Sequence, residues 1–382
     1  MARTKNRETK AARQAKRRET WIFRALLVVA LGLFVGFVFV SFFQNKREIN
    51  WTHLAEGIFV PAPSQQESPV ETQENKQRIG RRNDSLNSDP EQNEDPLAIG
   101  MAALTFDGIN PNLTEEQKRF VRSGYDFTQL HNKAFAVYDV KTKTYLAGRN
   151  METSLPPASL TKVMTCYTAL AREPMLDRRF KMPAEIFDWI YDKDLSVAGF
   201  EVGEEASLEQ LIYAAMLPSG ADGCLGMAYG LAGSQDKFVE WMNEDAKKLG
   251  LTQTHFENCV GSDATDHYSS ARDLVQLFER SLRLPDFEKA ASALSYVVPS
   301  NRVRKENLNL FSSVILPIRD EIGIPDGVTL AGGKTGYTED AGSCLIIRVQ
   351  KRDRDFILCV LNSGGDQGAA EQCMELAEHF LR

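Results

Sequence analysis

A serine and a lysine three positions apart, Ser159 and Lys162, are the residues of this chain best suited to chemistry. Side chains three residues apart on a helix lie on the same face. An uncharged lysine amine at that distance can take the proton from a serine hydroxyl, which makes the serine a nucleophile without any histidine. The apolar stretch 163–170 predicts a buried helix, so we expect Ser159 in its first turn, where free backbone N–H groups can face an anion. Alone the pair is a weak signal, because an ordinary helix cap can show the same spacing.

Two further motifs strengthen the prediction. Ser219-Gly220-Ala221 and Lys334-Thr335-Gly336 follow in the order S-x-x-K, S-x-x, K-T-G, which is typical of penicillin-binding proteins and class A β-lactamases. The chain resembles the serine D-alanyl-D-alanine carboxypeptidases, the low-molecular-weight penicillin-binding proteins of the peptidase S11 type. The resemblance covers roughly residues 134–381. It includes the segments Pro156-Pro157-Ala158-Ser159, Met216-Leu217-Pro218-Ser219, His267-Tyr268-Ser269-Ser270-Ala271-Arg272-Asp273 and Gly332-Gly333-Lys334-Thr335-Gly336-Tyr337-Thr338.

The resemblance implies an acyl-transfer reaction on a peptidoglycan stem peptide. Ser159 attacks the carbonyl between the last two D-alanines, D-alanine leaves, and water hydrolyses the acyl-enzyme. Lys162 is the expected base. Lowering a lysine pKa from ~10.4 to about 7 requires roughly 4–5 kcal/mol. Burial and a second cation, Lys334, are the expected sources of that shift.

The other site roles also follow from the resemblance. Ser219 is expected to relay the proton toward the leaving amine. The expected substrate-binding residues are Lys334, Thr335, Gly336 and Tyr337. Among them Thr335 holds the terminal carboxylate, and the backbone N–H groups of Ser159 and Tyr337 hold the oxyanion. No cofactor and no metal are expected, since the five histidines show no pair at zinc-ligand spacing.

Three features depart from the family pattern. The second motif often ends in an asparagine that contacts the substrate carbonyl and the lysine, and here that position is Ala221. In a well-known branch an arginine near the last helix helps to hold the carboxylate, and the matching position here is Ala369. That branch also has a second β-rich domain and a C-terminal amphipathic anchor. This chain ends at Arg382, so we expect an N-terminal span to provide the anchor.

Two other functions remain open at this stage. A β-lactamase would need a Glu-x-x-Leu-Asn loop, and the nearest string, Glu306-Asn307-Leu308-Asn309, is one residue short and too near Lys334. A tethered protein that binds penicillin or peptidoglycan with a slow or inactive site is the non-enzyme alternative. The alanines at positions 221 and 369 favour it, since each removes a polar contact.

The first 105 residues predict a membrane tether. Residues 1–24 hold nine Lys or Arg and two Glu, and residues 25–43 are uncharged, apolar and long enough to cross a bilayer. Basic residues before the span predict a cytoplasmic N-terminus and an extracytoplasmic catalytic domain in a bacterial cell membrane. The basic run alone could be a nucleic-acid-binding tail, but the apolar span that follows argues against this, and no nucleic-acid partner is expected. A cleaved signal peptide is the alternative to an anchor, but no small-x-small cleavage pattern follows. Residues 44–105 are polar and predict a flexible tether.

Residues 106–382 predict one extracytoplasmic peptidase domain. A short helix over 114–122, with Thr114 and Gln117 as a capping box, precedes a hairpin over 134–140 and 144–147. Helical patterns dominate 182–284, and strands are expected over 328–330, 344–349 and 356–361, then a helix over 369–381. This order predicts an α+β fold with a mostly antiparallel sheet closed by both ends of the domain and an inserted helical lobe, as in penicillin-binding proteins and β-lactamases. The six cysteines lie in apolar contexts, which favours buried free thiols.

Overall fold

The computed structural model describes residues 106–118, 121, 124–364 and 368–381, and its central feature is an antiparallel sheet of six strands. The strands lie in the order β1-β3-β2-β10-β9-β8. Their bounds are β1 Gly108–Ile109, β2 Asn132–Asp139, β3 Thr144–Arg149, β8 Thr329–Thr338, β9 Gly342–Lys351 and β10 Arg354–Ser363. The first strands of the domain therefore pair with the last ones, and β2 lies directly beside β10.

Apolar side chains fill both faces of the central strands. In β2, Ala136 and Tyr138 belong to one buried cluster, whereas Phe135 and Val137 belong to another. Successive side chains of a strand point to opposite faces of the sheet. A strand that is covered on both faces therefore needs an almost continuous apolar run, which is what β2, β9 and β10 have.

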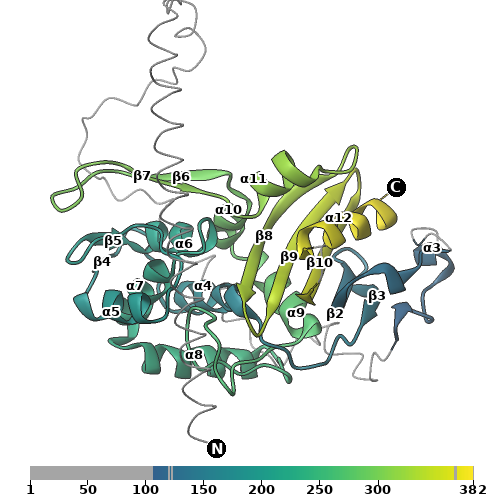
Figure 1. The fold of residues 1–382 in the computed structure, drawn as a ribbon, viewed down its shortest axis with the longest axis horizontal. Coiled ribbons are helices and arrows are strands. Elements are labelled where there is room, and N and C mark those ends of the chain that lie inside the picture. The colour runs from purple at the N-terminus through teal and green to yellow at the C-terminus, as the bar shows by residue number, and fades with distance from the viewer. Residues whose placement is uncertain (1–105, 119–120, 122–123, 365–367, 382) are drawn as a thin grey trace, which may run out of the picture. The chain divides into compact units, whose positions relative to one another are not determined.

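Helices cover the two faces and make three layers (Figure 1). On one face lies α12 Ala369–Phe380, near α11 Ile315–Pro317 and a π-helical turn at Ile318–Ile322. On the other face lies the helical lobe, inserted between β3 and β8. Its helices are α4 Thr161–Arg172, α5 Ala184–Asp192, α6 Leu208–Met216, α7 Ala221–Ala232, α8 Gln235–Lys248, α9 Ala271–Leu282 and α10 Pro285–Ser292. Two small strand pairs accompany it, β4 Arg179–Lys181 with β5 Glu205–Ser207 and β6 Ser295–Val298 with β7 Leu308–Phe311.

Serine and threonine caps fix where several helices begin. Ser207 and Gln210 form a reciprocal capping box at α6, and Ser234 and Ser270 cap α8 and α9. These side chains accept hydrogen bonds from backbone N–H groups that have no partner within the helix. The predicted box before the short helix α3 Glu115–Lys118 is confirmed, because Thr114 and Gln117 bond each other's backbone N–H.

The predicted fold class is confirmed: the protein has an α+β fold with an antiparallel sheet and an inserted helical lobe. The strand prediction was wrong in one respect. It placed the K-T-G motif between strands, but β8 runs through the motif to Thr338, with a register shift between Leu330 and Gly333. The sequence prediction also missed both small strand pairs, because runs of three or four residues are too short to show a period.

The cysteines and the N-terminal segment were the remaining structural predictions. As predicted, the six cysteines are buried and free: Cys166, Cys224, Cys259, Cys344, Cys359 and Cys373.

Within the described part of the chain, no helix has the length and apolar character needed to span a bilayer. The predicted tail, span and tether at 1–24, 25–43 and 44–105 lie outside the described residues and stay predictions.

Candidate active site

Ser159 lies in a tight turn that leads into the core helix α4. The turn is a 3₁₀ segment, Ala158–Leu160, and α4 begins at Thr161. The prediction that Ser159 occupies the first α-helical turn was therefore wrong by about two residues. Ala158 has φ 48°, a left-handed conformation that is strained for a residue with a side chain. Such strain is commonly held at functional sites, and here it precedes the predicted nucleophile directly.

Lys162 contacts the predicted nucleophile. Its Nζ lies 2.8 Å from Ser159 Oγ and donates to the carbonyl oxygen of Val260 at 2.7 Å. Lys162 is 3 % exposed, and burial lowers the pKa of its ammonium below the ordinary lysine value. A neutral amine can donate one N–H to Val260 while its lone pair accepts the hydroxyl proton of Ser159. The spacing predicted from the sequence thus places a base and a hydroxyl in hydrogen-bonding contact.

Lys334 lies on β8 and is completely buried, with its Nζ donating to the carbonyl oxygen of Thr335 at 2.7 Å. Burial, and then repulsion by Lys162, hold the pKa of Lys334 well below its usual range. From the sequence, Lys334 was expected to be the cation that shifts Lys162. In the structure, burial is the main cause of the lowered pKa of Lys162. For Lys334, repulsion by Lys162 lowers the pKa further than burial alone. Protonation of either lysine therefore opposes protonation of the other.

A loop at 258–263 joins the first and third motifs. The Asn258 Oδ1 accepts from the backbone N–H groups of Val260, Gly261 and Ser262, which fixes the loop and aims the Val260 carbonyl at Lys162. A Cβ on Gly261, which has φ 87°, would lie 1.9 Å from the carbonyl oxygen of Ala158. At the end of the loop, Asp263 accepts from the Thr338 hydroxyl at 2.6 Å. The turn that carries Ser159 is therefore shaped by a glycine about a hundred residues away in sequence.

Gly336 lies against the same turn. A Cβ at this position would lie 3.1 Å from the Ser159 nitrogen and 3.0 Å from Ala158 Cβ. Glycine here keeps space open in front of the Ser159 N–H, one of the two predicted oxyanion donors. The side chain of Tyr337 is 72 % exposed, which suits a wall of the site better than a proton-transfer group.

The second motif forms the turn before α7. Ser219 has φ 63°, a left-handed conformation like that of Ala158. Asp222 does not take the place of the missing asparagine. Its carboxylate accepts from the backbone N–H groups of Ala198, Gly199 and Phe200 and so fixes the neighbouring loop. The helix α7 that follows the motif packs against α4, the helix that carries Lys162.

Ala221 and Ala369 are both buried, at 1 % exposure each. Ala221 packs in the cluster of the helical lobe, whereas Ala369 packs in the cluster on the opposite face of the sheet. Thr335 pairs with Leu345, which belongs to the same cluster as Ala369, so Thr335 and Ala369 lie on the same face of the sheet. The alanine side chain nevertheless has no group that could replace the arginine that the family resemblance placed near Thr335. Instead, the Oγ1 of Thr335 lies 3.1 Å from the hydroxyl of Ser313.

Replacing Ala221 with asparagine tests the placement of the second motif. Because the methyl group is already packed, the larger side chain must displace its neighbours, and overpacking typically costs about 1–3 kcal/mol. A new hydrogen bond offsets only roughly 0.5–1.5 kcal/mol of this. We expect Ala221→Asn to slow penicillin acylation by about tenfold or less, measured by stopped-flow or quenched mass spectrometry. A loss as large as that of Lys162→Ala, in a folded variant, would contradict this placement.

His267 supports the start of α4 from a buried position. Its Nδ1 accepts from the Glu257 N–H at 3.0 Å, so Nε2 carries the proton and donates to Thr161 Oγ1 at 2.8 Å. Burial lowers the pKa of His267 to about 4. An unfolded histidine titrates near ~6.5, so between these values the unfolded state binds the extra proton and stability falls as the pH falls.

We expect this histidine to make folding acid-sensitive. Lowering the pH from about 6.5 to 4 should remove roughly 3 kcal/mol of the unfolding free energy through His267 alone. Urea titrations at several pH values measure the loss. His267→Gln, which cannot take up a proton, should show a shallower pH dependence. Identical slopes for both proteins would show that His267 is not the titrating group.

The sequence indicated the three motifs but not the residues that hold them in place. Val260, Gly261 and Asn258 carry a faint signal, an asparagine shortly before a glycine, which is typical of a fixed loop. Nothing in the sequence connects that loop to Ser159. Ser313 gave no signal at all, because a Ser-Ser pair after a short strand has no distinctive spacing.

Solved structures share this architecture. A point mutant of the Streptomyces K15 DD-transpeptidase superposes with a TM-score of 0.61 at 22 % identity, covering 66 % of this chain and 98 % of that one. A D-alanyl-D-alanine carboxypeptidase from Mycobacterium tuberculosis H37Rv gives a TM-score of 0.60 at 24 % identity, covering 68 % and 95 %. At these identities the likeness shows the fold alone. The protein has the DD-peptidase fold, with a serine and a lysine in contact beside the edge strand.

The family follows from the sequence comparisons. The model for D-alanyl-D-alanine carboxypeptidase, peptidase S11, matches residues 121–365, and the chain belongs to this family. The D-alanyl-D-alanine carboxypeptidase DacC of Escherichia coli K12 is 30 % identical over 244 residues, which is 62 % of this chain and 57 % of that protein. DacF of Bacillus subtilis 168 is 29 % identical over 271 residues, 70 % and 65 % of the two chains. The chain spans about three fifths of the length of the Escherichia coli relatives that it matches.

Proposed function

We propose that this protein is a serine D-alanyl-D-alanine carboxypeptidase that removes the terminal D-alanine of peptidoglycan stem peptides and is acylated by β-lactams. The observation that carries the proposal is the 2.8 Å contact between Ser159 Oγ and the buried amine of Lys162. Membership of the S11 family supports the choice of substrate.

The geometry supports the following sequence of steps. Lys162 takes the Ser159 proton as Oγ attacks the carbonyl carbon of the penultimate D-alanine. The Ser159 N–H, beside the space left by Gly336, stabilises the oxyanion together with the N–H of Tyr337. Ser219 passes the proton from the lysine to the leaving amine of D-alanine. A water molecule then attacks the acyl-enzyme, with the same lysine as base, and regenerates Ser159.

The edge strand β8 supports the binding of an extended peptide. Among the described strands only β9 pairs with it, and Gly336 of β8 lies against the turn that carries Ser159. Exposed strand edges bind extended peptides through main-chain hydrogen bonds. Thr335 on this strand is the donor to the terminal carboxylate.

One experiment separates this function from its alternatives. The full-length protein is incubated with penicillin and, separately, with a pentapeptide that ends in D-Ala-D-Ala. The mass of the Ser159 peptide and the release of D-alanine are then followed. A stable penicillin adduct with D-alanine release supports the carboxypeptidase. Rapid antibiotic turnover would instead indicate a β-lactamase.

A binding protein with a slow or inactive site is the second candidate. The buried alanines at positions 221 and 369 favour it, since neither gives the site a polar group. In the same experiment it would bind the peptide without releasing D-alanine, and any penicillin adduct would form slowly. A wild-type turnover rate no higher than that of Ser159→Ala would establish this second candidate over the first.

We further propose that residues 25–43 anchor the protein in a bacterial cell membrane, with the catalytic domain outside. The charge-free apolar stretch and the basic residues before it support this orientation. The protein should remain in the membrane fraction at high salt, and protease added outside should reach the catalytic domain. A secreted form whose N-terminus starts after residue 43 would contradict the anchor.

A further inference from the structure

Ser313 touches the third motif and the segment just before the second motif. It follows β7, where the β6–β7 hairpin returns to the sheet (Figure 1). Its Oγ lies 3.1 Å from Thr335 Oγ1, and its backbone N–H donates to the carbonyl oxygen of Leu217 at 2.9 Å. Leu217 is two residues before Ser219, so Ser313 is held between the two motifs.

The neighbouring serine has a different role. The Oγ of Ser312 accepts from the N–H groups of Val314 and Ile315 at 3.3 and 3.0 Å and fixes the turn after β7. Ser312 is buried at 5 % exposure, whereas Ser313 is half-buried. The turn is therefore built by Ser312, which leaves the Ser313 side chain to face Thr335.

The carboxylate side of the site holds two hydroxyl groups in contact. The amine of Lys334 donates to the Thr335 carbonyl oxygen, and Ala369, on the same face of the sheet as Thr335, has no polar side chain to add. A carboxylate has two oxygens that can each accept an O–H donor, and hydrogen bonds to ionised acceptors are roughly twice as strong as neutral ones. Two hydroxyls 3.1 Å apart can turn from each other to such a ligand.

We propose that Ser313 is a second hydroxyl donor to the terminal carboxylate of the substrate, acting with Thr335, and that it sets the preference for a free carboxylate over a carboxamide. The inference rests on the proposed function, because it assigns a group of the same substrate. A carboxamide is uncharged, so the hydrogen bonds that the two hydroxyls donate to it are weaker than those to a carboxylate.

The test compares two peptides on matched variants. The peptides are an acyl-D-Ala-D-Ala with a free carboxylate and the same compound with a C-terminal amide. Ser313→Ala should lower kcat/KM for the carboxylate by about tenfold and for the amide by less than about threefold. Ser313→Thr, which keeps the hydroxyl, should restore most of the preference. The melting temperature of Ser313→Ala should stay close to that of the wild type.

Ser312→Ala is the matched control, since it removes a hydroxyl from the adjacent residue. It should lower the melting temperature and leave the ratio of carboxylate to amide unchanged. Equal losses for both peptides in Ser313→Ala, or a melting temperature lowered as much as in the control, would overturn the proposal and make Ser313 a structural residue.

A binding measurement separates this inference from the proposed function. Calorimetry with Ser159→Ala, which cannot turn over, gives the affinity ratio of the two peptides, and the same ratio is measured in the double variant with Ser313→Ala. If the ratio of carboxylate to amide affinity falls about tenfold in the double variant, Ser313 binds the carboxylate, whether or not the wild type releases D-alanine. An unchanged ratio rejects Ser313, even when the wild type is an active carboxypeptidase.

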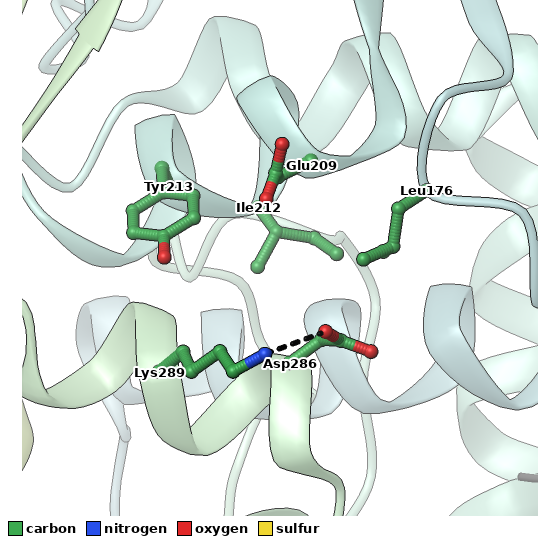
Figure 2. A pocket seen from close by; sticks show the side chains of 6 residues that line it. All are labelled: Leu176, Glu209, Ile212, Tyr213, Asp286 and Lys289. Atoms are coloured by element: carbon green, nitrogen blue, oxygen red, sulfur yellow. Dashed lines mark ion pairs between the residues drawn. The ribbon is translucent and has the colours of Figure 1, made fainter. Parts of the chain in front are cut away.

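The cavity between two helices of the lobe does not compete with this site. Figure 2 shows it between α6 and α10. On α10 the ammonium of Lys289 pairs with Asp286. Glu209 and Tyr213 approach from α6. The Tyr296 hydroxyl donates to Glu209, and its ring stacks on Tyr213. These side chains satisfy one another, so the cavity belongs to the packing between the helices.

Discussion

Ser159→Ala should abolish covalent labelling by penicillin and leave the domain folded. The substitution removes the oxygen that lies 2.8 Å from Lys162 Nζ, and a methyl group cannot form an acyl ester. Intact-protein mass spectrometry after long incubation measures the adduct, and a thermal melt checks the fold. Ser154→Ala is the matched control, since Ser154 is an exposed serine whose Oγ bonds Gln253. An adduct of unchanged yield in Ser159→Ala would show that another residue is the nucleophile.

Lys162→Ala should slow acylation at least ~100-fold, because general-base catalysis is typically worth about 10²–10⁴-fold. The amine is the group in contact with the Ser159 hydroxyl, and burial lowers its pKa, which favours the neutral form that accepts a proton. In the wild type the acylation rate should therefore rise with pH as Lys162 loses its proton, and this rise should occur at a lower pH than the ordinary pKa of lysine. The variant should lose this rise. Stopped-flow acylation across a range of pH measures both effects.

Lys162→Ala can be compared with a control substitution of an exposed lysine, and it should also change how stability depends on pH. Lys237→Ala removes an exposed lysine that pairs with Glu240, and it should leave acylation within about twofold. Between the lowered pKa of a buried lysine and its unfolded value near ~10.4, the unfolded state holds the extra proton, so stability rises with pH. Removal of Lys162 should flatten that rise. Acylation of Lys162→Ala within about tenfold of the wild type would remove Lys162 from its role as base.

Much of the fold could be predicted from the sequence, because the apolar runs are long and the motifs have a fixed order. The hairpin of β2 and β3 and the closing helix α12 lie within a few residues of their predicted bounds. The prediction was weaker where tertiary contacts decide the structure. The tight turn at Ala158 exists because Gly261 and Gly336 leave room for it, and no local pattern around Ser159 reports those two glycines.

The candidate site was predictable only where a residue belongs to a motif. The sequence indicated which lysine contacts the serine, since that pair is local. It did not indicate Val260, whose carbonyl orients the lysine, or Ser313, whose hydroxyl contacts Thr335. Each of these is brought in by a loop that is distant in the sequence. The relative pKa shifts of Lys162 and Lys334 also depend on burial, which the sequence does not give.

The pairing of β2 with β10 determines when this domain can complete its sheet during its synthesis. Phe135 pairs with Val360 and Ala136 with Cys359, so the middle of the sheet joins residues more than two hundred positions apart. Such distant pairings are slow to form, and they require the whole intervening chain. The hairpin of β8 and β9 therefore cannot join β2 and β3 in one sheet until the chain is made past Ser363. A chain that stops before β10 leaves the edges of β2 and β9 unpaired, and such exposed strand edges are prone to aggregation.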